Sequence, residues 1–231
     1  MIKSINYTGF FIYIIFIIII IYIETKYNLE DFLLIGILII SYFYFNRLNP
    51  LLNASNLRKI NRLVYFYSFI FIIIYFLFYN IISLMIFGEE EVFPYYLQQP
   101  FIYYIKALLI FPFLEELIFR RSLLRLLLVN YSAKKAIILS SFGFALCHYF
   151  SNTALFYTFL GSLFFGYLYL KYRNIWICFI MHSLHNLLVI IILPLIKVEF
   201  INSFKYPVIL LFIIVSLILI IFSLKKIINL K

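Results

Sequence analysis

The sequence predicts an all-α membrane protein, a polytopic bundle of about eight transmembrane helices with both termini in the cytoplasm. Hydrophobic residues make up 66% of the 231 residues, and the mean hydropathy is +1.09. A soluble domain is roughly 45–50% apolar, so a chain of this length cannot bury such a surplus and needs the bilayer as its solvent. The basic residues also gather in short segments between apolar runs, as orientation signals do.

The first four spans are predicted near 7–23, 32–46, 64–88 and 100–124, because a bilayer core takes about 20 apolar residues per helix. The first run follows Lys3, is too long for a signal-peptide core and lacks a small-residue cleavage site. We therefore expect an uncleaved first span. The fourth run differs from the others because it carries charged residues in its middle.

The last four spans are predicted near 135–150, 153–170, 174–194 and 206–224. With the N-terminus inside, the cytoplasmic loops and the C-terminal segment of this arrangement hold twelve Lys and Arg residues, and the outer segments hold three. This bias is the positive-inside pattern, and an even number of spans returns the C-terminus to the cytoplasm. No linker or repeat divides the chain, so we expect one integral membrane domain over residues 1–231.

Charge and cysteine content exclude several other classes of protein. The net charge of +10 could suggest a nucleic-acid partner, but the basic residues lie in short loops between apolar runs, so we expect the bilayer as partner and no nucleic acid. Cys147 and Cys178 lie inside apolar runs without CxxC spacing. The sequence therefore predicts neither a disulfide framework nor a thiolate metal site.

The acidic residues single out the fourth span. Of the nine, two lie inside a span, Glu115 and Glu116, while seven lie in the connecting segments: Glu24, Glu30, Asp31, Glu89, Glu90, Glu91 and Glu199. An ionisable group inside a span costs at least ~2.5 kcal/mol on insertion scales and is by default functional. Glu116 and Arg120 are four residues apart and share a helix face, so we expect a supporting ion pair. Glu115 is rotated about 100° away from Glu116.

Histidine and asparagine side chains add to the polar groups inside the spans. His148 lies in the fifth span, and His182, His185 and Asn186 lie in the seventh. His182 and Asn186 share a helix face, whereas we attribute His185 to packing. Counted from the cytoplasmic loops at ~1.5 Å per residue, Glu115, His148, His182 and Asn186 lie roughly 13–20 Å deep, near the midplane of a ~30 Å core. We therefore expect one shared site.

These side-chain types suit the hydrolysis of an amide bond by water. Glu115 suits a general base, and His148 could share a water with it and position that water for attack. An imidazole and an amide on one helix face, those of His182 and Asn186, suit donation to an oxyanion, a role whose loss commonly costs ~10²–10³ in rate.

A metal alternative stays open, because Glu115, His148 and His182 are suitable Zn²⁺ ligands and a catalytic zinc normally has three protein ligands. The HExxH signature is absent. We favour the reaction without a cofactor.

Three motifs carry a resemblance to a known family. EExxxR occurs at 115–120, FxxxH at 144–148 and HxxxN at 182–186, each on its own apolar run. In this order the chain resembles the CPBP family of intramembrane proteases, which includes type II CaaX prenyl endopeptidases and the Abi or bacteriocin-immunity proteins. The family is often labelled metalloprotease. The motifs run from about Pro112 to Asn186, within a family-like core at about 100–194.

The resemblance implies an intramembrane endopeptidase in which Glu115 and His148 activate water. It further implies an oxyanion hole formed by His182 and Asn186, with Glu116 and Arg120 in support. The expected substrate is a membrane-associated peptide, either a prenylated CaaX protein or a leader peptide, and the expected location is the cell membrane of a bacterium.

Two other classes of protein are alternatives. A non-catalytic immunity or scaffold protein would tolerate Glu115→Gln. A proton-coupled transporter would also use midplane Glu and His, but would more typically show repeated halves or paired broken helices.

Overall fold

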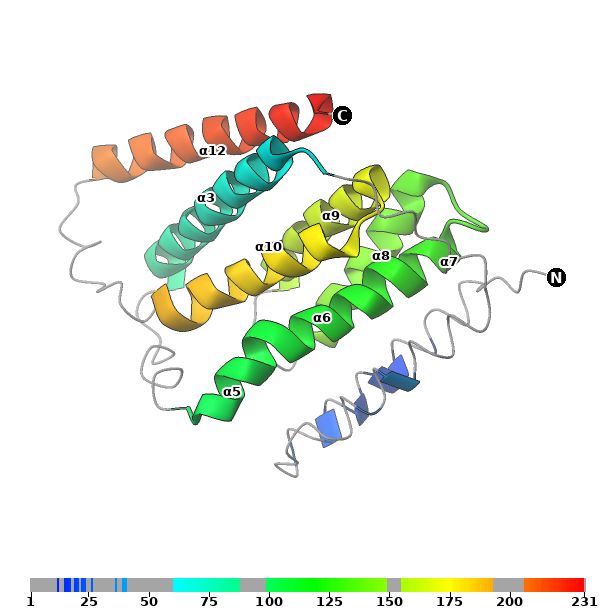
Figure 1. Cartoon of the computed structure of the whole chain (residues 1–231). Coiled ribbons are helices and arrows are strands. Elements are labelled where there is room, and N and C mark those ends of the chain that lie inside the picture. Colours follow the sequence, from blue (N-terminus) through cyan, green and yellow to red (C-terminus); the bar gives the residue numbers. More distant parts are fainter. Residues whose placement is uncertain are drawn as a thin grey trace. The chain divides into compact units, whose positions relative to one another are not determined.

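The computed structural model describes residues 60–87, 99–148, 155–192 and 206–230, together with isolated positions between 12 and 40 (Figure 1). The described residues form helices and no strands, which confirms the all-α prediction. The elements are, in chain order, α3 (Arg62–Phe87), α5 (Phe101–Ile105), η2 (Lys106–Ile110), α6 (Phe111–Glu116), η3 (Leu117–Leu124), α7 (Arg125–Leu127), α8 (Ala133–Cys147), α9 (Leu155–Tyr172), α10 (Ile175–Leu187), η5 (Leu188–Ile192) and α12 (Tyr206–Asn229).

Three of the described helical segments are long and apolar enough to cross a membrane, namely Arg62–Ile82, Ile175–Ile192 and Pro207–Asn229. They coincide with the predicted third, seventh and eighth spans. The predicted fourth, fifth and sixth spans are helical as well, although α8 has only 15 residues. Apart from isolated positions, the first two predicted spans lie outside the described residues. The count of eight spans and the orientation therefore stay predictions.

The chain divides into two compact units. The first unit comprises Met1–Arg58 and Phe111–Phe179, and the second comprises Lys59–Ile110 and Ile180–Lys231. Helix α10 begins in the first unit and ends in the second. The chain segments that carry the predicted site are thus shared between the two units.

In the second unit, α3 and α12 lie side by side (Figure 1). Helices in lipid gain little from burying apolar surface against one another, so their contacts favour small residues that let the backbones approach. Ser68 of α3 and Ser223 of α12 are fully buried in largely apolar helices. The rings of Tyr67 and Phe222 meet edge to face, with their centroids 6.1 Å apart. This pair of helices therefore packs by close approach and ring contact.

In the first unit, α8 packs against α9, and η3 packs against both. Gly166 of α9 makes the approach to α8 possible, because a Cβ at this position would lie 3.2 Å from Cγ2 of Ile137. At such a distance Ile137 would have to move. The close packing brings the buried hydroxyl groups of Ser140 and Ser162 up to the helix that carries Arg120.

A two-residue connection joins α9 to α10. Arg173 follows the end of α9 with φ 51°, and its N–H donates to the carbonyl of Tyr169 at 2.8 Å. The side-chain oxygen of Asn174 accepts a 2.8 Å hydrogen bond from the N–H of Trp176, which is the contact of a helix N-cap. The tight junction fixes where α10 begins and where the Arg173 side chain emerges.

Candidate active site

Two π-helical segments interrupt the helical run 101–127 and flank the predicted glutamates. Helix α6 lies between η2 and η3, and Glu115 and Glu116 are its last two residues. Insertions of π-helix are rare and frequently occur at functional sites, because they change which side chains share a face. Apolar periodicity alone predicted an uninterrupted helix here.

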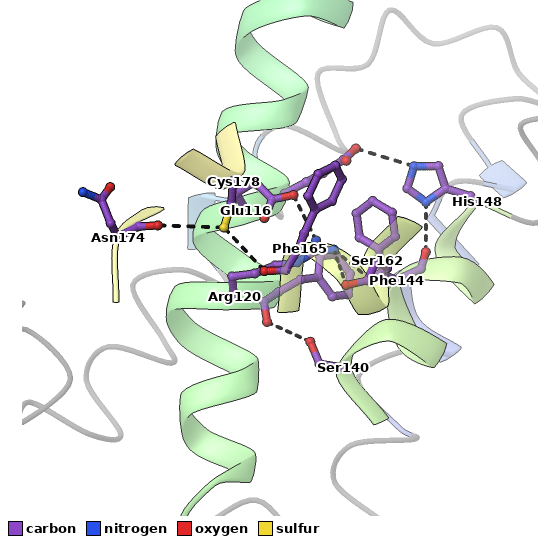
Figure 2. A network of polar contacts seen from close by, with 11 residues as sticks. Glu116, Arg120, Ser140, Phe144, His148, Ser162, Phe165, Asn174 and Cys178 are labelled. Carbon is purple, nitrogen blue, oxygen red and sulfur yellow. Dashed lines mark hydrogen bonds and ion pairs between the residues drawn. The ribbon is translucent and has the colours of Figure 1, made fainter. Parts of the chain in front are cut away.

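Glu116 and Arg120 form the predicted pair in the interior of the first unit. Their side chains are 0% and 1% exposed, and Oε1 of Glu116 lies 3.1 Å from Nη1 of Arg120. Nη2 of Arg120 donates to the Oγ of Ser162 at 2.7 Å (Figure 2). Buried charges are tolerated when they are paired and hydrogen-bonded. The predicted contact is therefore present, and the supporting role of the two residues stays a prediction.

Phe144 connects this pair to His148. The Arg120 guanidinium lies over the Phe144 ring, 4.5 Å from its centroid, and the His148 ring lies 4.4 Å away, between centroids (Figure 2). A guanidinium over an aromatic face is attracted by the ring quadrupole. The phenylalanine of FxxxH therefore sets the place of the imidazole, a role that the sequence pattern did not reveal.

His148 occupies the C-cap position of α8. Its Nδ1 lies 2.9 Å from the carbonyl oxygen of Phe144. A carbonyl oxygen can only accept, so Nδ1 carries the proton, and in the neutral ring Nε2 carries a lone pair. Nε2 lies 3.9 Å from Oε1 of Glu115, and the two side chains stay 24% and 17% exposed. The first unit therefore brings these two predicted residues together where water can reach them.

The spacing of Glu115 and His148 suits a shared water. At 3.9 Å the two acceptors are too far apart for a direct hydrogen bond, and a polar separation beyond about 3.5 Å is typical of a water bridge. A water that donates one hydrogen to the carboxylate and one to Nε2 turns its own lone pairs toward a third group. This is the geometry of a water activated by general bases.

The other two predicted residues lie on α10 in the second unit. His182 is buried, and Asn186 is one turn further on along the same face. Nδ2 of Asn186 donates to the carbonyl of Ala107 at 2.8 Å, and its Oδ1 lies 3.4 Å from Nδ1 of His185. The two contacts fix which way the amide faces. Two of the four predicted catalytic residues thus lie in each unit, and the single shared site stays a prediction.

The contact between Asn186 and Ala107 lies in the helical run that also contains Pro112. In a π-helix the carbonyl of residue 107 would accept from the N–H five residues further on, and that residue is Pro112, which has no N–H. Helix η2 ends at Ile110, and the Ala107 carbonyl accepts a hydrogen bond from the Asn186 amide.

Two of the three candidate zinc ligands lie in the same unit. Glu115 and His148 lie in the first unit, whereas His182 lies in the second. Over the described residues, no three His, Cys, Asp or Glu side chains form a ready metal-binding group. The zinc alternative therefore stays a prediction. Cys178 is buried and donates to the carbonyl of Phe165 at a sulfur–oxygen distance of 3.5 Å, so its thiol serves packing.

The sequence did not predict the residues whose hydrogen bonds hold the helix that carries Arg120 in place. Ser162 binds Arg120, and Ser140 donates to the carbonyl of Phe119 in η3 at 2.8 Å. Both serines are buried inside predicted spans. A buried hydroxyl in an apolar run is the one signal that would have found them.

A family model described as type II CAAX prenyl endopeptidase Rce1-like matches residues 69–188, just over half of the chain. The match contains all three motifs and also reaches back into α3, where the sequence itself showed no resemblance. Comparisons with curated proteins and with solved structures find no match.

Proposed function

Because the chain belongs to the Rce1-like family of type II CAAX prenyl endopeptidases, we propose that it is an intramembrane endopeptidase whose nucleophile is a water activated by Glu115 and His148. The observation that carries this proposal is the 3.9 Å separation of Oε1 and Nε2, with Nδ1 of His148 committed to the Phe144 carbonyl. Both groups then face a water as acceptors. A carboxylate and a neutral imidazole in this arrangement can take a proton from a water between them. Two ligands are fewer than the three protein ligands of a usual catalytic zinc site, so the pair by itself favours proton abstraction.

In the proposed reaction the water attacks the carbonyl carbon of the scissile peptide bond as Glu115 takes its proton. The tetrahedral intermediate carries negative charge on oxygen, and its collapse returns a proton to the leaving amine. We assign His182 and Asn186 to the oxyanion. Their common face on α10 supports this assignment, as does the Asn186 amide, which has two N–H donors and gives one of them to Ala107.

Glu116 and Arg120 take no part in proton transfer in this proposal. They hold Phe144, and Phe144 in turn holds the imidazole of His148. Their loss is therefore expected to lower the amount of folded protein before it lowers the rate of the chemical step.

The proposed substrate is a membrane-associated peptide. A prenylated protein ending in a CaaX sequence follows from the family, and a leader peptide is the second source of such a substrate. Either one approaches from the bilayer or its surface, which matches a protein that carries apolar helices long enough to span a membrane. We expect the reaction to need no metal ion.

The proposal is tested by comparing new protein termini in membranes that express wild type or Glu115→Gln at matched abundance. Termini present only with wild type would support proteolysis, and their sequences would identify the substrate class. Glu90→Gln makes the same chemical change in a predicted outer segment and should match wild type. If wild type and Glu115→Gln gave identical sets of termini while both were folded, the proposal would be wrong and the immunity or scaffold alternative would gain.

A further inference from the structure

A second site lies in the first unit, in a cavity of about 120 Å³. Its lining includes Phe113 of α6, Arg121 of η3, Tyr169 of α9, Arg173 at the junction of α9 and α10, and Trp176 of α10. Two arginines therefore line one small volume. Neither arginine forms an ion pair with a carboxylate of the described residues.

Arg121 provides a specific reason to expect an anion in the cavity. Its Nε is buried and has no hydrogen-bond acceptor within the described part of the chain. Buried donors are nearly always satisfied, so an arginine that lines a cavity and keeps an unsatisfied donor favours a ligand with acceptor atoms there. Arg125 lies four residues after Arg121 on the same helical run and adds a third positive charge to this end of the helix.

Arg173 is held at the cavity in a backbone conformation that arginine rarely adopts. Its φ of 51° lies in the left-handed region, which favours glycine and asparagine. The Tyr169 carbonyl on one side and the N-cap of Asn174 on the other maintain this conformation. The cost of the conformation needs a compensating role, and holding a cation beside Arg121 is such a role.

Aromatic side chains also line the cavity, namely those of Phe113, Tyr169 and Trp176. Trp176 stacks on Phe113 with centroids 5.8 Å apart, Phe179 meets both rings, and Trp176 remains 46% exposed. Tryptophan is enriched where a membrane protein meets the lipid headgroups. Arg173 lies in a predicted cytoplasmic loop, and Arg121 lies near the predicted cytoplasmic end of its span. The cavity thus combines cations with an apolar wall at the expected depth of the headgroups.

The cavity faces away from the catalytic glutamate. Phe113, Leu117 and Arg121 are spaced by four residues and line the cavity together. Glu115 is two residues after Phe113 in α6, and so projects about 200° around the helix from it. A peptide engaged at Glu115 and His148 would therefore lie on the other side of this helix, and the cavity takes a different occupant.

We propose that this cavity binds the phosphate of an anionic phospholipid headgroup in the cytoplasmic leaflet. Arginine pairs strongly and with defined geometry with phosphate oxygens, and basic pockets between membrane helices on the cytoplasmic side bind such headgroups. A phosphate group is no bulkier than benzene, which an apolar cavity of about 150 Å³ accepts. The acyl chains would then run past Trp176 toward the bilayer.

Trp176 makes the test direct because it is the one tryptophan in the chain. The protein is reconstituted in two samples of bilayers that contain phosphatidylcholine and phosphatidylglycerol in the same proportions. In one sample the acyl chains of phosphatidylglycerol carry the bromine label, and in the other those of phosphatidylcholine carry it. Bromine quenches tryptophan fluorescence on contact. We expect brominated phosphatidylglycerol to occupy the site roughly thirtyfold more readily than brominated phosphatidylcholine, given about 1 kcal/mol for each of the two arginines near an anionic lipid.

The double variant Arg121→Gln with Arg173→Asn should abolish this preference, and asparagine tolerates the left-handed conformation at residue 173. Lys134→Gln with Lys135→Gln removes the same charge from exposed positions at the start of α8 and should keep it. If the double variant does not fold, Arg173→Asn alone should still lower the preference.

Three outcomes would overturn the proposal. Equal quenching by the two brominated lipids in wild type would show that the cavity does not select an anionic lipid. Relief of quenching by millimolar inorganic phosphate would identify a site for a free anion. Relief by a peptide with a free C-terminal carboxylate, but not by its amide, would identify a peptide site instead.

Discussion

Breaking the buried ion pair of Glu116 and Arg120 on one side only should be more harmful than replacing both partners. The pair is 0% and 1% exposed with a 3.1 Å contact, so Glu116→Gln leaves a guanidinium in the interior with Ser162 as its remaining close side-chain hydrogen-bond acceptor. Removing one partner of a buried pair costs about 3–5 kcal/mol. Arg120→Met should cost a similar amount, because it leaves the carboxylate and also removes the cation from the Phe144 ring.

The double variant Glu116→Leu with Arg120→Met should regain most of this loss, since apolar residues of similar volume often replace a buried pair at little net cost. We expect its free energy of unfolding to lie within about 1 kcal/mol of wild type. Unfolding by sodium dodecyl sulfate in mixed micelles, followed by circular dichroism, measures all three variants on one scale.

The same series separates structure from chemistry. If the pair only supports the site, the folded double variant should retain cleavage, because Glu115 and His148 are unchanged. A cost below about 1 kcal/mol for Glu116→Gln would refute the burial argument. A double variant as unstable as the sum of the two single variants would refute the pairing.

Three further predictions concern the surroundings of the site. Pro112→Ala adds a backbone N–H that can compete with Asn186 for the Ala107 carbonyl, so the thermal midpoint should rise while cleavage falls; unchanged cleavage would remove the positioning role of this contact. Ser162→Ala removes a 2.7 Å hydrogen bond to a charged group and should lower the free energy of unfolding by about 1.5–3 kcal/mol in the same micelle assay, with no change in rate for the protein that remains folded. Turnover by purified protein should survive dialysis against EDTA and 1,10-phenanthroline, whereas loss that Zn²⁺ restores would establish the zinc alternative.

Sequence patterns were sufficient for the helices and for the local pairing of charges. Six predicted spans are helical in the described residues, and the i,i+4 spacing of Glu116 and Arg120 gave their contact. Both features are determined by residues that are close in sequence, because side chains four residues apart on a helix are neighbours. The common depth of Glu115 and His148 also matched their approach in the first unit.

The residues that fix the site geometry depend on contacts between distant parts of the chain. The carbonyl of Ala107 is 79 residues from Asn186, and Ser162 is 42 residues from Arg120. Neither partner has a side-chain type that marks it as functional. The π-helical segments were equally hidden, because an apolar run has the same composition whether it forms an α-helix or a π-helix. Only Pro112 gave a local sign of where the helix would change.

The most direct test of a water shared by Glu115 and His148 is a double-mutant cycle on the rate of the chemical step. Glu115→Gln, His148→Gln and the double variant would be assayed in single-turnover cleavage of a prenylated CaaX peptide or of the substrate that the termini identify. Residues that act on one water as a unit lose their effect together, so all three variants should be slowed by about the same factor, roughly 10² or more. Losses that multiply in the double variant would contradict the shared water and assign the two residues to separate steps.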